Sequence, residues 1–253
     1  MFLAKSAALT RLLAFSLLAF PATAALSAGE AAYDPLVVST EWKGKPFDTE
    51  VEDKARSRAI PIRIYLPQGK DAAPVVLFSH GLGGSRSGSQ FLGQHWCARG
   101  YAVVYIQHPG SDTSVWQGKP LGQRMTAMKQ AANAQNLLLR VKDIPAVLDQ
   151  LEKWNADAGH QLHGRLDLKR LGMSGHSFGA ITTQAVSGQS MGGMGQPYTD
   201  ARIKAAIPFS PSSPRQQDNG QAFGKIGIPW LLMTGTEDNS PIGDIDVESR
   251  LAV

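Results

Sequence analysis

The pentapeptide Gly-His-Ser-Phe-Gly at residues 175–179 constrains the fold more than any other part of this sequence. A G-x-S-x-G sequence is typical of a nucleophile elbow, a sharp turn that lifts a serine hydroxyl above a sheet between a strand and a helix. The serine backbone is strained there, and the crowded turn leaves no room for side chains at Gly175 and Gly179. We therefore predict a strand, a turn at Ser177 and a helix.

Apolar patterns along the chain predict strands that alternate with helices. The continuous apolar runs at 74–79 and 101–106 are typical of strands buried on both faces, and the alternating segment 60–66 indicates an antiparallel strand at the start of the sheet. Further strands are predicted at 170–174, 203–209 and 228–234, and helices at 88–99, 120–155 and 178–188. This alternation predicts an α/β fold with a doubly wound, mostly parallel sheet.

The N-terminus has the pattern of a secretory signal peptide. Lys5 and Arg11 precede an apolar run at 12–20, and an Ala-Thr-Ala-Ala sequence follows at 22–25. The run is too short for a bilayer, which takes about 20 residues, so no stable membrane span is expected. We predict a signal peptide at 1–24, one domain at 25–253, and a periplasmic or secreted protein.

Charge and cysteine content exclude several classes of protein. The formal charge is +4 and falls to +2 once the two signal-peptide cations are removed. The remaining basic residues are scattered rather than clustered, which argues against a nucleic-acid partner. Cys97 is the single cysteine, so no internal disulfide forms, and its helical context indicates a buried thiol.

Other candidate functional residues follow the strands of the predicted sheet. Functional groups gather at the carboxyl ends of the strands in such sheets. The glycine-rich turn 80–84 follows the strand at 74–79, and we predict that it exposes the Leu82 N–H. This group and the N–H of Phe178 would form an oxyanion hole. Asp238 follows the segment 228–234 and is the candidate acid, with Glu237 as its nearest competitor.

Three motifs in order resemble the α/β-hydrolase superfamily: Phe-Ser-His-Gly-Leu-Gly at 78–83, Arg140-Val141-x-Asp143, and the pentapeptide. Within it, the chain resembles the bacterial predicted dienelactone hydrolases and the plasma-type platelet-activating-factor acetylhydrolases. The resemblance implies hydrolysis of a small-molecule or lipid ester through an acyl-serine, with no metal or organic cofactor.

Two departures from the family pattern bear on this resemblance. The namesake dienelactone hydrolases use a cysteine nucleophile, whereas this pentapeptide holds Ser177, which argues against a dienelactone substrate. The acetylhydrolases place their acid after the preceding strand. Segment 210–214 of this chain has no carboxylate, which favours Asp238.

The general base is not evident from the sequence. In this fold the order along the chain is serine, acid, histidine, yet all six histidines precede Asp238. His80 and His176 belong to the two turns and are expected to support the backbone. His108 follows a strand at the functional edge, so it is either a substitute base or a residue that lines the substrate cleft.

The C-terminal residues begin a helical pattern at Asp246 and stop at Val253. We therefore hypothesise that the sequence is a truncated record of a longer protein whose catalytic histidine lies beyond Val253.

Two functions are consistent with these features. The first is an exported serine ester hydrolase of the carboxylesterase or acetylhydrolase type. The second is a catalytically silent α/β-hydrolase-like module that binds an acyl ligand or a partner, because no base is placed. A serine peptidase is disfavoured, because nothing marks a peptide-binding subsite.

Overall fold

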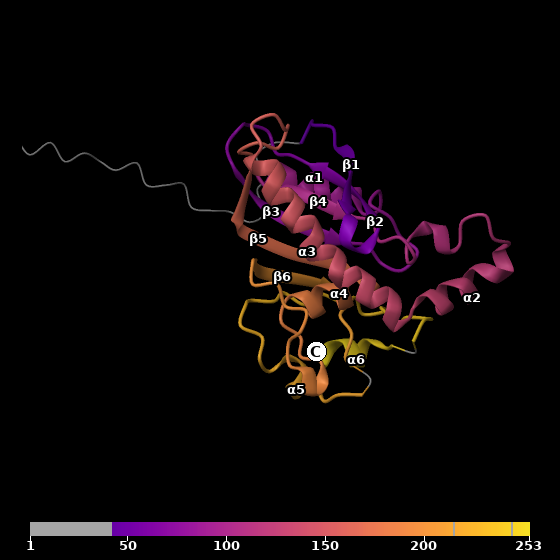
Figure 1. The fold of residues 1–253 in the computed structure, drawn as a ribbon. Coiled ribbons are helices and arrows are strands. Elements are labelled where there is room, and N and C mark those ends of the chain that lie inside the picture. Colours follow the sequence, from indigo (N-terminus) through magenta and orange to yellow (C-terminus); the bar gives the residue numbers. More distant parts are fainter. Residues whose placement is uncertain (1–41, 215, 244) are drawn as a thin grey trace, which may run out of the picture. The chain divides into compact units, whose positions relative to one another are not determined.

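The computed structural model describes residues 42–253, except 215 and 244. The predicted signal peptide at 1–24 lies outside this range. A six-stranded sheet with the order β1-β2-β4-β3-β5-β6 forms the centre of the described domain (Figure 1). Its strands are Phe47–Asp53 (β1), Arg58–Tyr65 (β2), Ala73–Ser79 (β3), Ala102–Ile106 (β4), Leu166–His176 (β5) and Ile203–Phe209 (β6).

The sheet is mostly parallel, as predicted. Strands β4, β3, β5 and β6 pair in parallel, whereas β2 is antiparallel to both β1 and β4. Strand β1 was missed by the sequence patterns because it is an edge strand rich in charged residues, with Val51 as its one buried residue. The α/β fold of the doubly wound type is confirmed.

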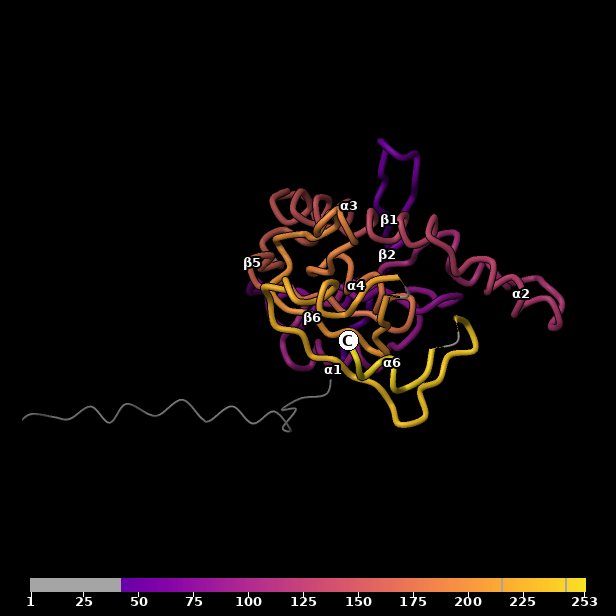
Figure 2. Tube along the Cα trace, turned by 90° about the horizontal axis from the view of Figure 1, so that it is seen from below, coloured from indigo at the N-terminus to yellow at the C-terminus, as the bar shows by residue number. Residues whose placement is uncertain are grey.

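Helices cover both faces of the sheet. Buried residues of α3 and α4 pack on one face with Ile62, Val75 and Val104, while α1 contributes Cys97 to a smaller cluster on the other face with Tyr105. Helix α2 extends away from the sheet in both views (Figures 1 and 2). The helices are Gln90–Ala98 (α1), Leu121–Ala131 (α2), Ala134–Ala156 (α3), Phe178–Val186 (α4), Asn219–Phe223 (α5) and Val247–Leu251 (α6), with short 3-10 helices at Lys54–Arg56 (η1), Thr113–Val115 (η2) and Gly192–Met194 (η3). None of the described helices is long and apolar enough to cross a bilayer.

The predicted strand at 228–234 is wrong as a continuous strand. This segment runs parallel to β6 but pairs with it only through isolated bridges at Trp230 and Met233. The N–H groups of Ala206 and Ser210 donate to this segment, at 3.0 and 2.7 Å. Pro208 lies between them and has no N–H to donate, so the ladder is interrupted at that residue.

The nucleophile elbow fixes how closely α4 approaches the sheet. A side chain at Gly179 would overlap the carbonyl oxygen of Ser79 at the end of β3, and one at Gly175 would overlap the carbonyl of Gly179. Backbone therefore meets backbone at this point, which a Cβ atom would prevent. The two glycines of the motif are needed for this contact.

Substitution of Gly179 by alanine tests this contact. Because the added methyl would overlap rigid backbone, we expect Gly179→Ala to lower the free energy of unfolding by about 4 kcal/mol or to abolish folding. Gly193→Ala is the control, since a Cβ there meets no atom within 4 Å. Urea unfolding measures both variants, and a Gly179→Ala protein as stable as Gly193→Ala would contradict the close approach.

Candidate functional site

Ser177 occupies the predicted strand–turn–helix. Strand β5 ends at His176 and α4 begins at Phe178, so the serine is the turn itself. Its backbone has φ 55° and ψ −114°. This positive φ is rare for a residue with a side chain, and such strain is typical of functional sites. The Ser177 N–H donates to the carbonyl of Phe209 on β6 at 3.0 Å, which secures the turn.

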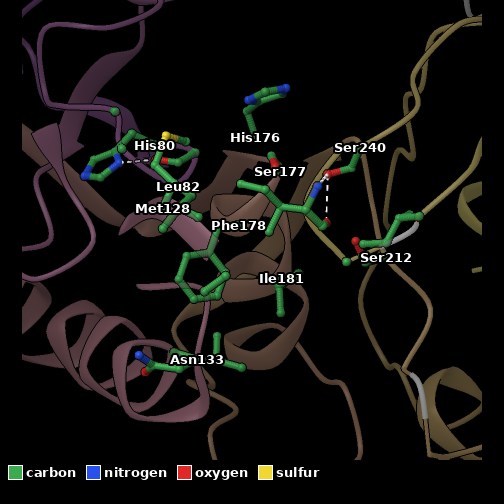
Figure 3. Close-up of a pocket in the computed structure, with 18 of the residues that line it drawn as sticks. His80, Leu82, Met128, Asn133, His176, Ser177, Phe178, Ile181, Ser212 and Ser240 are labelled. Carbon is green, nitrogen blue, oxygen red and sulfur yellow. Dashed lines mark hydrogen bonds between the residues drawn. The ribbon is translucent and has the colours of Figure 1, made fainter. Parts of the chain in front are cut away.

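Ser177 lies at a cleft of about 1070 Å³. Figure 3 shows Ser177 with Leu82 and Met128 on one side and Ser212 and Ser240 on the other. The wall combines the turn after β3, helix α2 and residues 240–243 and 245, with an apolar part that includes Ile181. Ser177 is partly exposed, so a ligand in the cleft can reach it.

The turn after β3 adjoins the serine, as the oxyanion prediction requires. A Cβ built on Gly81 would lie 3.6 Å from the Ser177 Cβ. The turn is fixed by the Gly83 N–H, which donates to Ser111 at 2.9 Å, and by the Gly84 N–H, which donates to Gly81 at 3.0 Å. Within the described part of the chain, neither the Leu82 N–H nor the Phe178 N–H donates to a protein acceptor.

Asp238 lies in the loop after segment 228–234 and is held by three neighbours. Thr234 Oγ1 donates to its carboxylate at 3.0 Å, and Arg250 Nε donates to its main-chain carbonyl at 2.7 Å. Partial burial raises the pKa of Asp238. Hydrogen bonds from Ser210 and Thr234 and the charge of Arg250 outweigh this effect, so the net pKa lies below its usual value. The carboxylate is therefore ionised at neutral pH.

Asp238 lies close enough to His176 for their charges to interact. The charge of Asp238 raises the pKa of His176, but burial has the larger effect and lowers the pKa overall. The competing carboxylate of Glu237 is exposed to solvent. None of the described histidines forms a hydrogen bond with the Ser177 hydroxyl.

His108 is neither a base nor a cleft residue, which corrects the expectation from sequence. Its side chain is completely buried, and it does not line the cleft. Its Nδ1 lies 2.9 Å from an Asp143 oxygen, and its Nε2 lies 3.0 Å from Ser79 Oγ. Burial lowers the pKa of His108 to about 4 despite the carboxylate of Asp143. The imidazole is therefore neutral and inaccessible to solvent.

The serine, histidine and carboxylate of this buried group have the spacing of a catalytic triad, but Ser79, His108 and Asp143 are each completely buried. Arg58 donates to both oxygens of Asp143, at 2.8 and 2.9 Å. Sequence reasoning missed this network. A signal did exist, since Arg140 and Asp143 interrupt the apolar face of a helix three residues apart.

Cys97 is buried, as predicted. Its Sγ donates to the carbonyl of Tyr101 at 3.2 Å, and burial raises the pKa of the thiol to about 12. A thiol with this pKa is unreactive near neutral pH. Across the described residues, no group of histidine, cysteine and carboxylate side chains is arranged to hold a metal ion.

Comparison with known proteins identifies the family. Residues 57–209 match the family of platelet-activating factor acetylhydrolase, isoform II. The chain belongs to this family. The matched range runs from β2 to the end of β6, so it includes the turn after β3, the Arg140 helix and the elbow. This membership confirms the resemblance to the acetylhydrolases that the sequence motifs indicated.

Solved structures agree with this acetylhydrolase family membership at the level of fold. A cold-adapted esterase from an Arctic intertidal metagenomic library is 15% identical, with a TM-score of 0.54 over 81% of this chain and 76% of that one. A protein assigned as a dienelactone hydrolase from Klebsiella pneumoniae is also 15% identical, with a TM-score of 0.52 over 83% and 79%.

An acylaminoacyl peptidase from Pyrococcus horikoshii is 16% identical, with a TM-score of 0.51. The match covers 75% of this chain but only 32% of the peptidase. These likenesses establish the α/β-hydrolase fold. No curated protein sequence matches the chain.

Replacing Asp143 tests the buried network. Burial raises the pKa of Asp143, but His108 and Arg58 outweigh it and depress the pKa below its usual value. The stability that this carboxylate contributes is therefore present at neutral pH and is lost as the pH falls through its folded-state pKa. We expect Asp143→Asn to cost about 3 kcal/mol at pH 7, because the half-buried Arg58 loses its charged partner.

The difference in unfolding free energy between Asp143→Asn and the wild type should narrow only as the pH falls below the usual carboxyl pKa of about 3.9. Urea unfolding at several pH values measures it. Asp149→Asn is the control, because this carboxylate is largely exposed and its ion pair with Arg202 contributes little. Equal stability of Asp143→Asn and the wild type at pH 7 would contradict the role of the network.

Proposed function

We propose that this chain carries the nucleophile, the oxyanion hole and the acid of a serine carboxylic-ester hydrolase. The observation that carries the proposal is the strained Ser177 turn, which opens into the cleft beside the turn that contains Leu82. The family match supports a hydrolase, and the elbow supports a serine nucleophile within it.

In the proposed reaction, Ser177 Oγ attacks the ester carbonyl carbon while a base takes its proton. The tetrahedral oxyanion accepts hydrogen bonds from the N–H groups of Leu82 and Phe178. The bond to the alcohol oxygen then breaks, the base returns the proton to the alcohol, and an acyl-serine remains. Water then attacks the acyl carbonyl carbon while the same base takes a proton from it. The base returns this proton to Ser177 Oγ, and the carboxylic acid product leaves.

We propose Asp238 as the acid and a histidine beyond Val253 as the base. The acid orients the imidazole and stabilises it when it is protonated. Support comes from the ionised state of Asp238 and from the lack of a hydrogen bond between any described histidine and Ser177. Sequencing the gene across the codon for Val253 tests this idea, since a genuine stop codon there would exclude it.

The proposed substrate is a small-molecule or lipid ester. The cleft wall around Ser177 includes the apolar side chains of Met128, Leu137 and Ile181, which suit an acyl chain. The family name includes an acetylhydrolase of platelet-activating factor, so short acyl groups are the first to test. We further propose export to the periplasm or medium after removal of residues 1–24, which N-terminal sequencing of the mature protein would check.

Ser177→Ala tests the nucleophile. We expect hydrolysis of p-nitrophenyl butyrate by the full-length protein to fall by about 10⁶ in kcat, because the acyl-serine can no longer form. Spectrophotometric release of p-nitrophenol measures it, and mass spectrometry locates the acyl group in the wild type. Activity of Ser177→Ala equal to the wild type would refute the nucleophile.

Asp238→Asn tests the acid against its neighbour. We expect kcat to fall by about 10⁴, as for a triad that has lost its carboxylate. Glu237→Gln is the matched control and should keep wild-type kcat, because this adjacent carboxylate is exposed to solvent. The reverse result would assign the acid to Glu237.

A second function is favoured because no histidine among the described residues forms a hydrogen bond with the Ser177 hydroxyl. A module without an activated serine could bind an acyl ligand without cleaving it. A fluorophosphonate probe separates the two functions, because rapid labelling requires an activated nucleophile. Rapid labelling of Ser177 in the full-length protein supports the hydrolase, whereas ligand binding without labelling supports the silent module.

A further inference from the structure

We infer that Arg140 is a positioning residue for the oxyanion hole, because its single guanidinium contacts both segments that carry the proposed N–H donors. This inference rests on the proposed function. Arg140 belongs to α3 and is completely buried beneath the site. It contacts neither the cleft nor Ser177, so any effect on catalysis must pass through the backbone that it holds.

The first segment is the turn after β3. Arg140 Nη1 donates to the His80 carbonyl at 2.7 Å, and Nη2 lies 3.4 Å from the Gly81 carbonyl. The peptide that begins with the Gly81 carbonyl ends with the Leu82 N–H, so holding this carbonyl orients that N–H. Arg140 Nε also donates to Ser111 Oγ at 2.7 Å, and the Ser111 carbonyl accepts the Gly83 N–H.

The second segment is the start of α4. The Arg140 guanidinium carbon lies 4.5 Å from the centroid of the Phe178 ring, the geometry of a cation–π contact. Phe178 is buried, and its backbone supplies the second proposed donor. A planar guanidinium can hold two carbonyls at its edge while its face lies on an aromatic ring, which an ammonium group cannot do.

The neighbours of Arg140 form a chain of hydrogen bonds with one consistent direction. The His108 N–H donates to His80 Nε2 at 3.1 Å, so the proton of neutral His80 is on Nδ1 and is donated to the Gly81 carbonyl at 2.6 Å. Ser79 Oγ accepts from Arg140 at 3.4 Å and donates to His108 Nε2, while His108 Nδ1 donates to Asp143. Each link orients the next.

Burying the charge of Arg140 costs stability, which indicates a functional role for this residue. Among the described residues, no carboxylate forms an ion pair with Arg140, although the charges of Asp143 and Asp112 act on it from farther away. Burial lowers the pKa of Arg140, yet a guanidinium stays charged at neutral pH. A buried charge held mainly by neutral acceptors costs stability that an apolar residue would not.

The test compares Arg140→Met, Arg140→Lys and wild type in the full-length protein with a fluorophosphonate probe. The phosphoryl oxygen of the probe would occupy the proposed oxyanion hole during attack by Ser177. We expect the maximal rate of inactivation to fall about 100-fold in Arg140→Met, the effect of a misplaced oxyanion donor, and about tenfold in Arg140→Lys. The probe concentration for half-maximal rate should stay unchanged, because Arg140 does not touch the ligand.

Arg202→Met is the matched control. Arg202 makes ion pairs with Asp200 and Glu152 far from the cleft, so its loss should lower stability and leave the labelling rate unchanged. Unfolding temperatures are measured for all variants, and labelling is carried out well below them. Wild-type labelling rates in a folded Arg140→Met protein would overturn the inference.

Two further measurements keep the inference testable. If Arg140→Met does not fold, Ser111→Ala removes one acceptor of Arg140, and a severalfold slower labelling rate is expected; an unchanged rate in both Ser111→Ala and Arg140→Lys overturns the inference. If the wild type is not labelled, the proposed function fails rather than the inference. Amide hydrogen exchange then decides, since Arg140→Lys should exchange faster at 81–84 and 178–179, and unchanged exchange overturns it.

Discussion

The contact between the nucleophile elbow and the end of β3 determines the rest of the site. At this point Gly179 lies directly on the Ser79 carbonyl, with no space for a side chain. The contact places the Ser177 turn beside the turn that contains Leu82, although about 100 residues separate them in sequence. Without it, the strained serine would have no turn beside it to supply the proposed oxyanion donor at Leu82.

Polar side chains, rather than apolar ones, fill the space beneath these two turns. Arg140, Asp143 and His108 are completely buried there. His108 is hydrogen-bonded to Asp143, and Arg140 donates to Ser111 Oγ and to the His80 carbonyl. Such a network is favourable only when every member has a partner, and it then holds one arrangement more strictly than an apolar core does. This strictness matters where two N–H groups must point at one developing charge.

The sequence predicted those parts of the fold that depend on local patterns. The apolar runs of β3 and β4 and the pentapeptide around Ser177 were sufficient for the α/β sheet and the elbow. Strand β1 was missed because it is rich in charged residues and has little apolar pattern. The expected strand at 228–234 is interrupted by a proline on its neighbour, β6, which the segment itself cannot reveal.

The candidate site was only partly predictable, because local patterns do not show contacts between residues that are distant in sequence. Ser177 and the turn at Leu82 follow strands, so topology places them at one edge of the sheet. The position of His108 after a strand suggested a cleft residue, but its burial depends on Asp143 and Ser79, which lie far away in sequence. A role for Arg140 beneath both turns needed the packing of α3, which no local pattern contains.

A crystal structure of the full-length protein after reaction with a fluorophosphonate would test the central claim most directly. We expect phosphorus bonded to Ser177 Oγ and the phosphoryl oxygen within about 3 Å of both the Leu82 and the Phe178 nitrogens. The Arg140 guanidinium should remain between the Gly81 carbonyl and the Phe178 ring. A phosphoryl oxygen directed away from both N–H groups, or an adduct on another residue, would contradict the account.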